Sequence, residues 1–199
     1  MRRLFAQGYD YAVAGLERVI SERRKRLAQS LSGKVLELGS GTGANLAYLP
    51  DSVDWTGIEP NPHMSACLAA KFPGRQVIEA TAEKIPFADA TFDSCLATLV
   101  LCSVDDLARS VSEIRRVLKP GGTFAFLEHV IAPPRTIARA TQQVIYWPWR
   151  CLCEGCRTNR DSLSAIEASF DKVEVESYWV PWWVAPPWVR YQVCGVAHA

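Results

Sequence analysis

Three glycines at two-residue spacing are the clearest candidates for chemistry in this chain. Gly39, Gly41 and Gly43 directly follow the apolar segment 34–38, which has the pattern of a short buried strand. Glycine lets the backbone approach a ligand closely and adopt a positive φ angle. Ligands of parallel α/β sheets bind outside the carboxyl ends of the strands. The spacing therefore predicts that this loop holds part of a cofactor.

Two acidic residues lie beside this loop. Glu59 ends the next predicted strand and, with Gly39, Gly41 and Ala44, satisfies the loose dinucleotide fingerprint G-x-G-x-x-G/A. The loop alone therefore leaves NAD and S-adenosylmethionine both open. Glu37 lies inside the first strand, two residues before the first glycine, where its carboxylate can address a ligand's ammonium group. A pyrophosphate ligand lacks such a group, so Glu37 favours S-adenosylmethionine.

His129 is the best-placed candidate for proton transfer. It ends a predicted strand over 123–129, and an imidazole at that edge of a sheet can act as a general base on a bound acceptor. The alternative is a histidine that only packs beneath the segments that follow. We predict His129 as the catalytic residue and keep the packing alternative open.

Three cysteines, Cys151, Cys153 and Cys156, form a C-x-C-x-x-C run. Structural zinc needs a fourth ligand and usually two paired C-x-x-C knuckles. No fourth ligand is evident in the sequence, so we predict no metal site. Cys156 is expected to be structural or to line a pocket, and Cys102, which follows the fourth strand, to fill buried space.

Tryptophans are dense in the C-terminal third, at Trp147, Trp149, Trp179, Trp182, Trp183 and Trp188. Some must be core, and the others can line a pocket for an apolar or aromatic acceptor or rest on a membrane interface. We predict Trp149, Cys156 and Arg160 as acceptor contacts. Arg160 would pair with a carboxylate on the substrate or, within the fold, with one of the nearby acids Glu154, Asp161 and Glu167.

Alternating strands and helices must position these residues. The N-terminal helix has apolar residues at helical spacing from Ala12 to Leu27, and its basic run Arg23–Arg26 is expected to be a solvated face. Five strand–helix alternations follow, and prolines and tryptophans break the periodicity after Ile131. The pattern predicts a Rossmann-like, doubly wound, mostly parallel α/β sheet of seven strands. The predicted strands are 34–38, 54–59, 76–79, one within 91–101, 123–129, 172–178 and 191–197, and the helices after the first are 46–49, 61–72, 105–118 and 162–170.

Composition and charge limit the possible partners. The chain has 199 residues, 49% of them hydrophobic, and a net charge of +1, so it can bury a sizeable core but offers no strong field to nucleic acid. Seven cysteines are an odd number, and without an export signal they favour a reduced, cytoplasmic protein. No window has the roughly 20 apolar residues of a membrane helix. We expect a monomer or homodimer without an integral membrane segment, and leave peripheral membrane contact open.

Two further motifs decide between the cofactors. Ala82-Glu83-Lys84-Ile85-Pro86-Phe87, with Phe92-Asp93, follows the third strand, and Arg116-Val117-Leu118-Lys119-Pro120-Gly121-Gly122 precedes the fifth. With the glycine loop and Glu59, in this order, they resemble the motifs of the class I S-adenosylmethionine-dependent methyltransferases over about residues 30–130. The resemblance implies a single domain over 1–199: a helical segment 1–30, a cofactor-binding core 31–130, and an acceptor-side lid with the C-terminal strands over 131–199.

The same resemblance implies roles for individual residues. The loop Gly39–Gly43 would cradle the methionyl part and the sugar of S-adenosylmethionine, and Glu59 would accept hydrogen bonds from both ribose hydroxyls. Ala82 and Glu83 would lie at the adenine; relatives often carry Gly-Asp just before them, where this chain has Ala80-Thr81. The expected cofactor contacts are Glu37, Gly39, Ser40, Gly41, Gly43, Glu59, Pro60, Ala82, Glu83 and Thr98.

Four longer stretches narrow the expected acceptor. Gly57–Met64, Thr98–Val104, Glu128–Val130 and Gly155–Asp161 are similar to small methyltransferase-like enzymes that methylate alkyl thiols. Those animal relatives carry a hydrophobic N-terminal anchor, which we do not expect here. The resemblance implies methyl transfer to a small hydrophobic acceptor, with a thiol favoured. Two alternatives stay open: an N-methyltransferase acting on phosphatidylethanolamine or another amine, and a non-catalytic subunit that only binds the cofactor.

Overall fold

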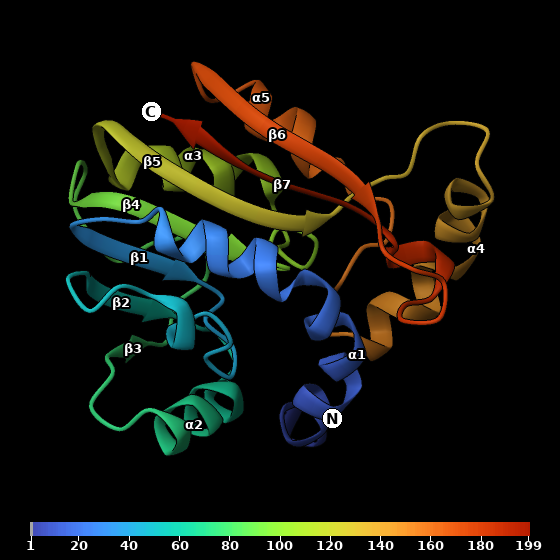
Figure 1. Cartoon of the computed structure of the whole chain (residues 1–199), viewed down its shortest axis with the longest axis horizontal. Coiled ribbons are helices and arrows are strands. Elements are labelled where there is room, and N and C mark those ends of the chain that lie inside the picture. Colours follow the sequence, from blue (N-terminus) through green and yellow to red (C-terminus); the bar gives the residue numbers. More distant parts are fainter. Residues whose placement is uncertain (1) are drawn as a thin grey trace.

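The centre of the molecule is a seven-stranded sheet in the order β3-β2-β1-β4-β5-β7-β6 (Figure 1). The computed structural model describes residues 2–199. Strands β1 to β5 run parallel, whereas β7 is antiparallel to both β5 and β6. The strands are β1 (Lys34–Leu38), β2 (Asp54–Ile58), β3 (Val77–Ile78), β4 (Phe92–Thr98), β5 (Leu118–His129), β6 (Lys172–Trp179) and β7 (Tyr191–His198). This confirms the predicted Rossmann-like, mostly parallel architecture.

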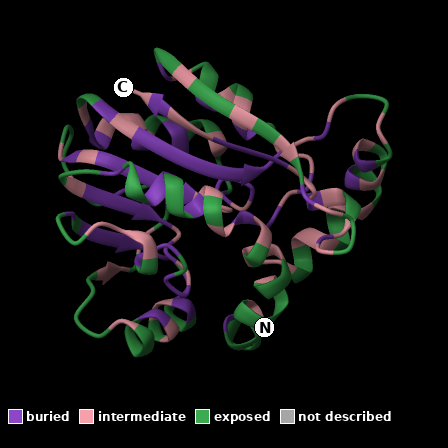
Figure 2. Ribbon diagram, in the orientation of Figure 1, coloured by how far each residue is buried: buried purple, intermediate pink, exposed green. Residues whose placement is uncertain are grey.

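Helices cover both faces of the sheet. The helices α1 (Arg2–Gln29) and α2 (Pro62–Lys71) lie on one face, and α3 (Leu107–Val117) and α5 (Ser162–Glu167) on the other (Figure 1). Ile20, Leu27 and Leu68 pack on the first face, and Ile114 and Ile166 belong to the core of the second. Figure 2 shows the result: the central strands are buried, whereas the edge strand β6 and the outer sides of the helices are exposed. Burial of these apolar side chains is the main term that favours this layered arrangement.

Local signals set several of the element boundaries. Asn61 caps α2, because its side chain accepts a hydrogen bond from the His63 backbone N–H at 3.0 Å, and Pro62 opens the helix. Asp106 caps α3 in the same way through the Arg109 N–H at 3.0 Å. The predicted helix over 46–49 is instead a three-residue 3₁₀ helix, η1 (Leu46–Tyr48). Its following residue, Leu49, is already extended and leads the chain towards β2.

The helix α4 (Ile137–Leu152) was not anticipated from the sequence. Its outer side carries large exposed hydrophobic residues, Val144 and Trp147 among them. The pattern of polar and apolar residues along α4 therefore does not show which of its faces is buried. Gln142 fixes the helix instead: its side-chain amide accepts from the Ala132 N–H and donates to the Val130 carbonyl, both at 2.9 Å. A second short 3₁₀ helix, η2 (Pro187–Val189), packs against α4.

The chain reverses its direction of travel across the sheet between β1 and β4. It runs outward from β1 to β3, and β4 then pairs with the opposite side of β1. The loops that follow β1 and β4 therefore face each other, the arrangement in which open α/β sheets bind ligands. None of the helices within residues 2–199 is long and apolar enough to cross a membrane.

Candidate active site

The glycine loop takes the left-handed backbone conformation that its sequence predicts. Gly39 has a φ of 55°, and a Cβ atom there would lie 2.7 Å from Val100 Cγ2 in the loop after β4. Gly43 has a φ of 87°, and its Cβ would lie 2.9 Å from the Phe72 ring. Larger residues are disfavoured at both positions for two reasons: the positive φ angle would strain their backbone, and their Cβ atom would be too close to a neighbouring side chain. The loop is thereby held close to the end of β4.

Glu59 organises the polar groups around this loop. Its carboxylate accepts hydrogen bonds from the backbone N–H groups of Gly41 and Asn61, both at 2.9 Å. Burial raises the pKa of Glu59 above its usual value. Two neighbouring polar atoms, Ser40 Oγ and Asn61 Nδ2, are buried without a hydrogen-bond partner within residues 2–199. Pro60, another predicted contact, lies exposed directly after Glu59.

Glu37 is buried beneath the loop. Its two carboxylate oxygens accept hydrogen bonds from Asn45 Nδ2 at 2.7 Å and from the Trp55 indole N–H at 2.8 Å. Burial raises the pKa of Glu37 to about 7, although the Arg24 charge acts in the opposite direction. A carboxylate in this setting gains from any additional positive charge, because a nearby cation offsets the cost of its desolvation.

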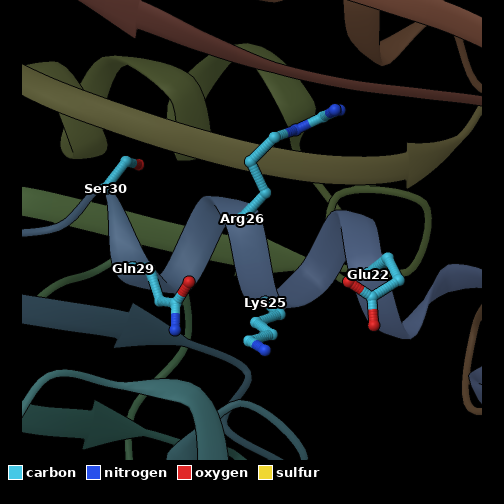
Figure 3. Close-up of a pocket in the computed structure, with 5 residues that line it drawn as sticks. All are labelled: Glu22, Lys25, Arg26, Gln29 and Ser30. Atoms are coloured by element: carbon cyan, nitrogen blue, oxygen red, sulfur yellow. The ribbon is translucent and has the colours of Figure 1, made fainter.

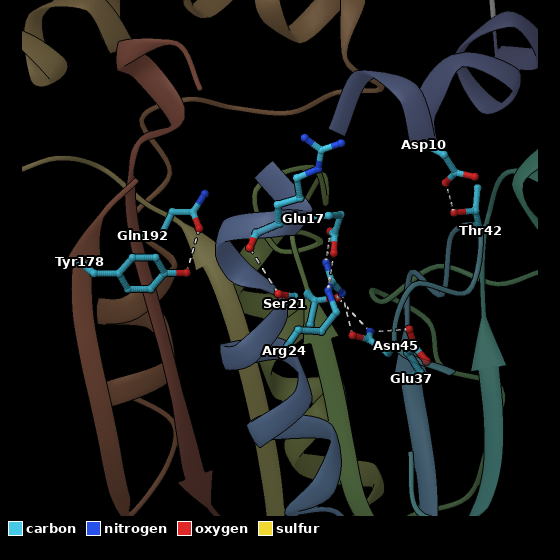
Figure 4. A network of polar contacts seen from close by, with 11 residues as sticks. Asp10, Glu17, Ser21, Arg24, Glu37, Thr42, Asn45, Tyr178 and Gln192 are labelled. Atoms are coloured by element: carbon cyan, nitrogen blue, oxygen red, sulfur yellow. Dashed lines mark hydrogen bonds and ion pairs between the residues drawn. The ribbon is translucent and has the colours of Figure 1, made fainter. Parts of the chain in front are cut away.

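Arg24 corrects the expectation that the basic run of α1 is solvated throughout. It is only 3% exposed and reaches from α1 into the site, as Figure 4 shows. Its guanidinium donates to Asn45 Oδ1 at 2.6 Å and to Thr98 Oγ1 at 2.8 Å, and forms an ion pair with Glu17 at 2.6 Å. Thr98, a predicted cofactor contact at the end of β4, is thus joined to the segment after β1 both through Arg24 and directly, by a hydrogen bond from Asn45 Nδ2 at 2.9 Å.

A second α1 contact ties the helix to the loop. Asp10 accepts a hydrogen bond from Thr42 Oγ1 at 2.7 Å and pairs with Lys71 of α2. Together with the Arg24 contacts, this attaches α1 at two points, Asp10 and Arg24, to the segment that follows β1 (Figure 4). The helix therefore covers the glycine loop. The sequence predicted the helix but not its role as a cover.

The expected adenine-side residues lie after β3. Ala82 is buried, and Glu83 is partly buried. The Glu83 carboxylate accepts from the backbone N–H groups of Asp105, at 2.6 Å, and Asp106, at 3.3 Å, just before α3. One of its oxygens therefore holds the loop after β4, and its contact with adenine stays a prediction.

The residues predicted for the acceptor side converge at the carboxyl end of β5. His129 Nε2 lies 3.0 Å from Cys156 Sγ, and the Trp149 indole N–H donates to the same sulfur at 3.2 Å. His129 Nδ1 is buried without a partner among the described residues. Trp149 packs edge-on against Trp188 with ring centroids 5.4 Å apart. Three residues that were predicted separately thus form one cluster.

Comparison with known proteins identifies the family. Residues 36–126 match the family model of a methyltransferase domain. The chain is 39% identical to the human thiol S-methyltransferase TMT1A over 160 residues, which cover 75% of the chain and 66% of that protein. It is 32% identical to the rat thiol S-methyltransferase TMT1B over 195 residues, 94% of the chain and 78% of that protein. The chain is a class I S-adenosylmethionine-dependent methyltransferase.

Solved structures support the fold of this methyltransferase. A crystal structure from Thermotoga maritima, described as a SAM-dependent methyltransferase and possible histamine N-methyltransferase, superposes with a TM-score of 0.66. The match covers 100% of this chain and 99% of the other at 20% identity, so it bears on the fold alone. The predicted family and fold are both confirmed.

Sequence reasoning missed that Cys102 lies beside His129 and Cys156. This methyltransferase brings the Cys102 sulfur to the cluster, where the ligand atoms of Cys102, His129 and Cys156 all lie within 4.8 Å of one another. The pKa of Cys102 is raised by its hydrogen bond to Cys156 and by burial. Its position directly after β4, at the same edge of the sheet as His129, was the available signal. Cys151, by contrast, is exposed.

Arg160 does not pair with the acids expected from the sequence. Its Nη2 donates to the Val104 carbonyl at 2.5 Å, and its Nε is buried without a partner in residues 2–199. Burial lowers the pKa of Arg160. The neighbouring Arg157 takes the ion pair instead, with Asp105 at 2.8 Å. Arg160 therefore braces the loop after β4, and its contact with an acceptor stays a prediction.

A surface hollow along α1 lies outside this arrangement. It is lined by polar residues of that helix and its end, namely Glu22, Lys25, Arg26, Gln29 and Ser30 (Figure 3). Arg26 is engaged there by an ion pair with Glu176 of β6 at 2.7 Å. The hollow is open and formed by one element, so we assign it no part in methyl transfer.

Proposed function

We propose that this methyltransferase moves a methyl group from S-adenosylmethionine to the thiol of a small hydrophobic acceptor. The observation that carries the proposal is the cluster at the end of β5, where an imidazole and an indole N–H converge on one buried sulfur. The same hydrogen-bonding groups would stabilise the ionised form of an acceptor thiol bound beside them. The similarity to proteins named thiol S-methyltransferases, 31–39% identical in sequence, supports the same acceptor.

The residues around the glycine loop fit the cofactor. Ser40 Oγ and Asn61 Nδ2, both buried and without a hydrogen-bond partner among residues 2–199, are polar groups that a bound polar ligand would satisfy. Glu59 would accept from the ribose hydroxyls, and Glu37 would face the ammonium group. When bound, S-adenosylmethionine supplies an electrophilic methyl group on a sulfonium sulfur.

The chain's own contribution on the acceptor side is to deliver an ionised thiol. A free thiol has a pKa of ~8.5, so only a few per cent is thiolate at neutral pH. We assign His129 to promote loss of that proton from an acceptor thiol bound beside this cluster, where the imidazole already lies 3.0 Å from the sulfur of Cys156. Trp149 and Trp188 would give the acceptor an apolar wall, which holds it in line with the methyl group and excludes water.

An acceptor panel tests this proposal directly. Release of S-adenosylhomocysteine is measured with alkyl and aryl thiols, amines, phenols and phosphatidylethanolamine vesicles. We expect turnover with hydrophobic thiols. Turnover with amines or vesicles and none with thiols would contradict the proposal and favour the N-methyltransferase alternative. Absence of turnover with every class, in protein that binds S-adenosylmethionine, would favour a non-catalytic subunit.

Glu59→Gln is expected to weaken S-adenosylmethionine binding by about 1–3 kcal/mol, because an amide cannot accept two hydroxyl hydrogen bonds as strongly as a carboxylate. Titration calorimetry measures the change. Glu79→Gln is the matched control, since Glu79 is an exposed acid after the next strand, β3. An equal affinity of both variants would remove Glu59 from the cofactor site.

The pH dependence of binding is expected to report on Glu37. Its pKa of about 7 in the free protein lies above the ordinary value, so the carboxyl is mostly protonated below pH 7. A cationic ammonium binds the ionised form. The ionised fraction of Glu37 falls about tenfold between pH 8 and pH 6, the protonated fraction of the ligand's amino group rises by about 2.5-fold, and affinity should therefore fall by about fourfold. Glu37→Gln should flatten this slope.

Glu128 provides the control for this pH dependence. Burial also raises its pKa to about 7, but its carboxylate accepts from the backbone N–H groups of Val100 and Leu101 at 2.8 and 2.9 Å. Glu128→Gln is therefore expected to keep the slope. A pH dependence of binding that persists in Glu37→Gln and vanishes in Glu128→Gln would show that Glu128, and not Glu37, is the titrating group.

A further inference from the structure

Three metal-ligating side chains from separate parts of the chain meet in one buried cluster. Cys102 follows β4, His129 ends β5, and Cys156 follows α4. They are 2%, 4% and 8% exposed. Their ligand atoms all lie within 4.8 Å of one another, and His129 Nε2 and Cys156 Sγ are 3.0 Å apart. The fold brings these three groups together although they are far apart along the sequence.

The donor set selects a class of metal. Two thiols and an imidazole suit a borderline-soft ion such as zinc, whereas magnesium and calcium require oxygen ligands. Catalytic zinc sites keep three protein ligands and one open position, and two cysteines with one histidine is a known catalytic set. The Trp149 indole N–H, which donates to Cys156 Sγ, supplies the kind of outer hydrogen bond that tunes a metal-bound thiolate.

We propose that Cys102, His129 and Cys156 bind one zinc ion, whose open position takes the sulfur of the acceptor. The proposal rests on the thiol acceptor proposed above and explains how its proton is lost. It replaces the sequence-based expectation of no metal site. That expectation considered only Cys151, Cys153 and Cys156, whereas two of the ligands proposed here come from strand ends far from that run.

The chemical steps balance without an oxidant or reductant. Zinc binding releases the protons of Cys102 and Cys156 to solvent. The acceptor thiol then replaces a water on the metal, and its S–H proton also goes to solvent, because a coordinating thiol is deprotonated. A bond forms between the acceptor sulfur and the methyl carbon, the bond from that carbon to the sulfonium sulfur breaks, and its electron pair stays on S-adenosylhomocysteine. The neutral thioether product is a weaker ligand and leaves the metal.

Metal uptake by the full chain tests the site independently of activity. The protein is purified under reducing conditions, freed of metal with a chelator, and titrated with zinc or cobalt(II). We expect one ion per chain by mass spectrometry of the metal content, and a thiolate-to-cobalt charge-transfer band in the near ultraviolet. Cys102→Ser, Cys156→Ser and His129→Gln should each lose or weaken that band while circular dichroism confirms their fold.

Cys153→Ser and Cys151→Ser are the matched controls. Both residues belong to the same C-x-C-x-x-C run as Cys156 but lie outside the cluster. We expect both variants to keep one ion per chain and the charge-transfer band. Loss of the ion in Cys153→Ser with retention in Cys102→Ser would overturn the proposed ligand set.

Thiol methylation then tests the role of the metal. At pH 7 the metal-free enzyme should turn over a simple thiol about 30-fold more slowly than the zinc-loaded enzyme, the ratio of full ionisation to the thiolate fraction of a free thiol with a pKa of ~8.5. Adding zinc to the metal-free enzyme should restore the rate of thiol methylation.

The outcomes separate this inference from the proposed function. Thiol turnover by protein that takes up no metal, unaffected by chelators, would overturn the zinc site and leave the thiol proposal standing with His129 as a free base. A zinc-loaded cluster without thiol turnover would overturn both the acceptor role of the metal and the proposed function. The site would also be overturned if the protein formed a Cys102–Cys156 disulfide and took up no metal after that disulfide was reduced.

Discussion

Replacing Arg24 by methionine is expected to destabilise the folded protein by about 1–3 kcal/mol, the usual cost of leaving buried hydrogen-bonding groups without their partner, because the Glu17 carboxylate that remains is partly exposed to solvent. The guanidinium is buried between α1 and the end of β4 and donates to Glu17, Asn45 and Thr98. Methionine fills much of the same space but donates no hydrogen bond. The loss therefore leaves the Glu17 carboxylate without its ion pair and the Asn45 amide oxygen without its donor, whereas the Thr98 hydroxyl keeps its hydrogen bond from Asn45 Nδ2.

Urea denaturation measures this change. Arg26→Met is the control, because Arg26 lies two residues further along α1, is 64% exposed and pairs with a Glu176 carboxylate that is 42% exposed. An exposed pair of this kind contributes about 0–1 kcal/mol. Equal destabilisation by the two substitutions would mean that the buried network does not hold α1 over the site. A loss confined to Arg24→Met would show that this network fixes the cover of the glycine loop.

His129→Ala is expected to lower kcat for a thiol acceptor by about 10²-fold or more near neutral pH, the usual range for a group that handles the reacting proton. The loss should shrink as the pH approaches the pKa of the acceptor thiol, since the substrate then ionises unaided. Affinity for S-adenosylmethionine should change little, because the glycine loop and Glu59 lie at the ends of other strands.

A pH–rate profile and titration calorimetry, on the same variant, check both parts of this expectation. A loss of kcat that is independent of pH would make His129 a packing residue beneath the helix that follows. A large loss of cofactor affinity would place it in the cofactor site instead. Robust methylation of amines by the unaltered enzyme, without thiol turnover, would remove the premise that a thiol must be ionised.

Local sequence determined the conformation of the glycine loop and of the segment after β2. The glycine loop, the N-terminal cap of α2 at Asn61 and the position of Glu59 at the end of β2 all follow from residues within a few positions of one another. Each depends on backbone conformation or hydrogen bonding that neighbouring residues alone can satisfy. This is why strand–helix alternation and the order of the motifs were sufficient to predict the fold and the family.

Tertiary structure decided the features whose partners are far apart along the chain. A basic run on a helix predicts a solvated face, and only the packing of α1 on the sheet shows that Arg24 is buried against Asn45 and Thr98. Similarly, α4 is held by the amide of one buried glutamine, Gln142, which no periodicity reveals.

The cluster of Cys102, His129 and Cys156 is the clearest example of this second kind. Each residue taken alone has the pattern of a buried or packing side chain, and the C-x-C-x-x-C run contains only one of the three members of the cluster. Parallel strands place their carboxyl ends at one edge of the sheet, so β4 and β5 bring Cys102 and His129 together, and the chain after α4 adds Cys156. The physical reason is that side-chain chemistry depends on spatial neighbours, which the fold supplies and local sequence does not encode.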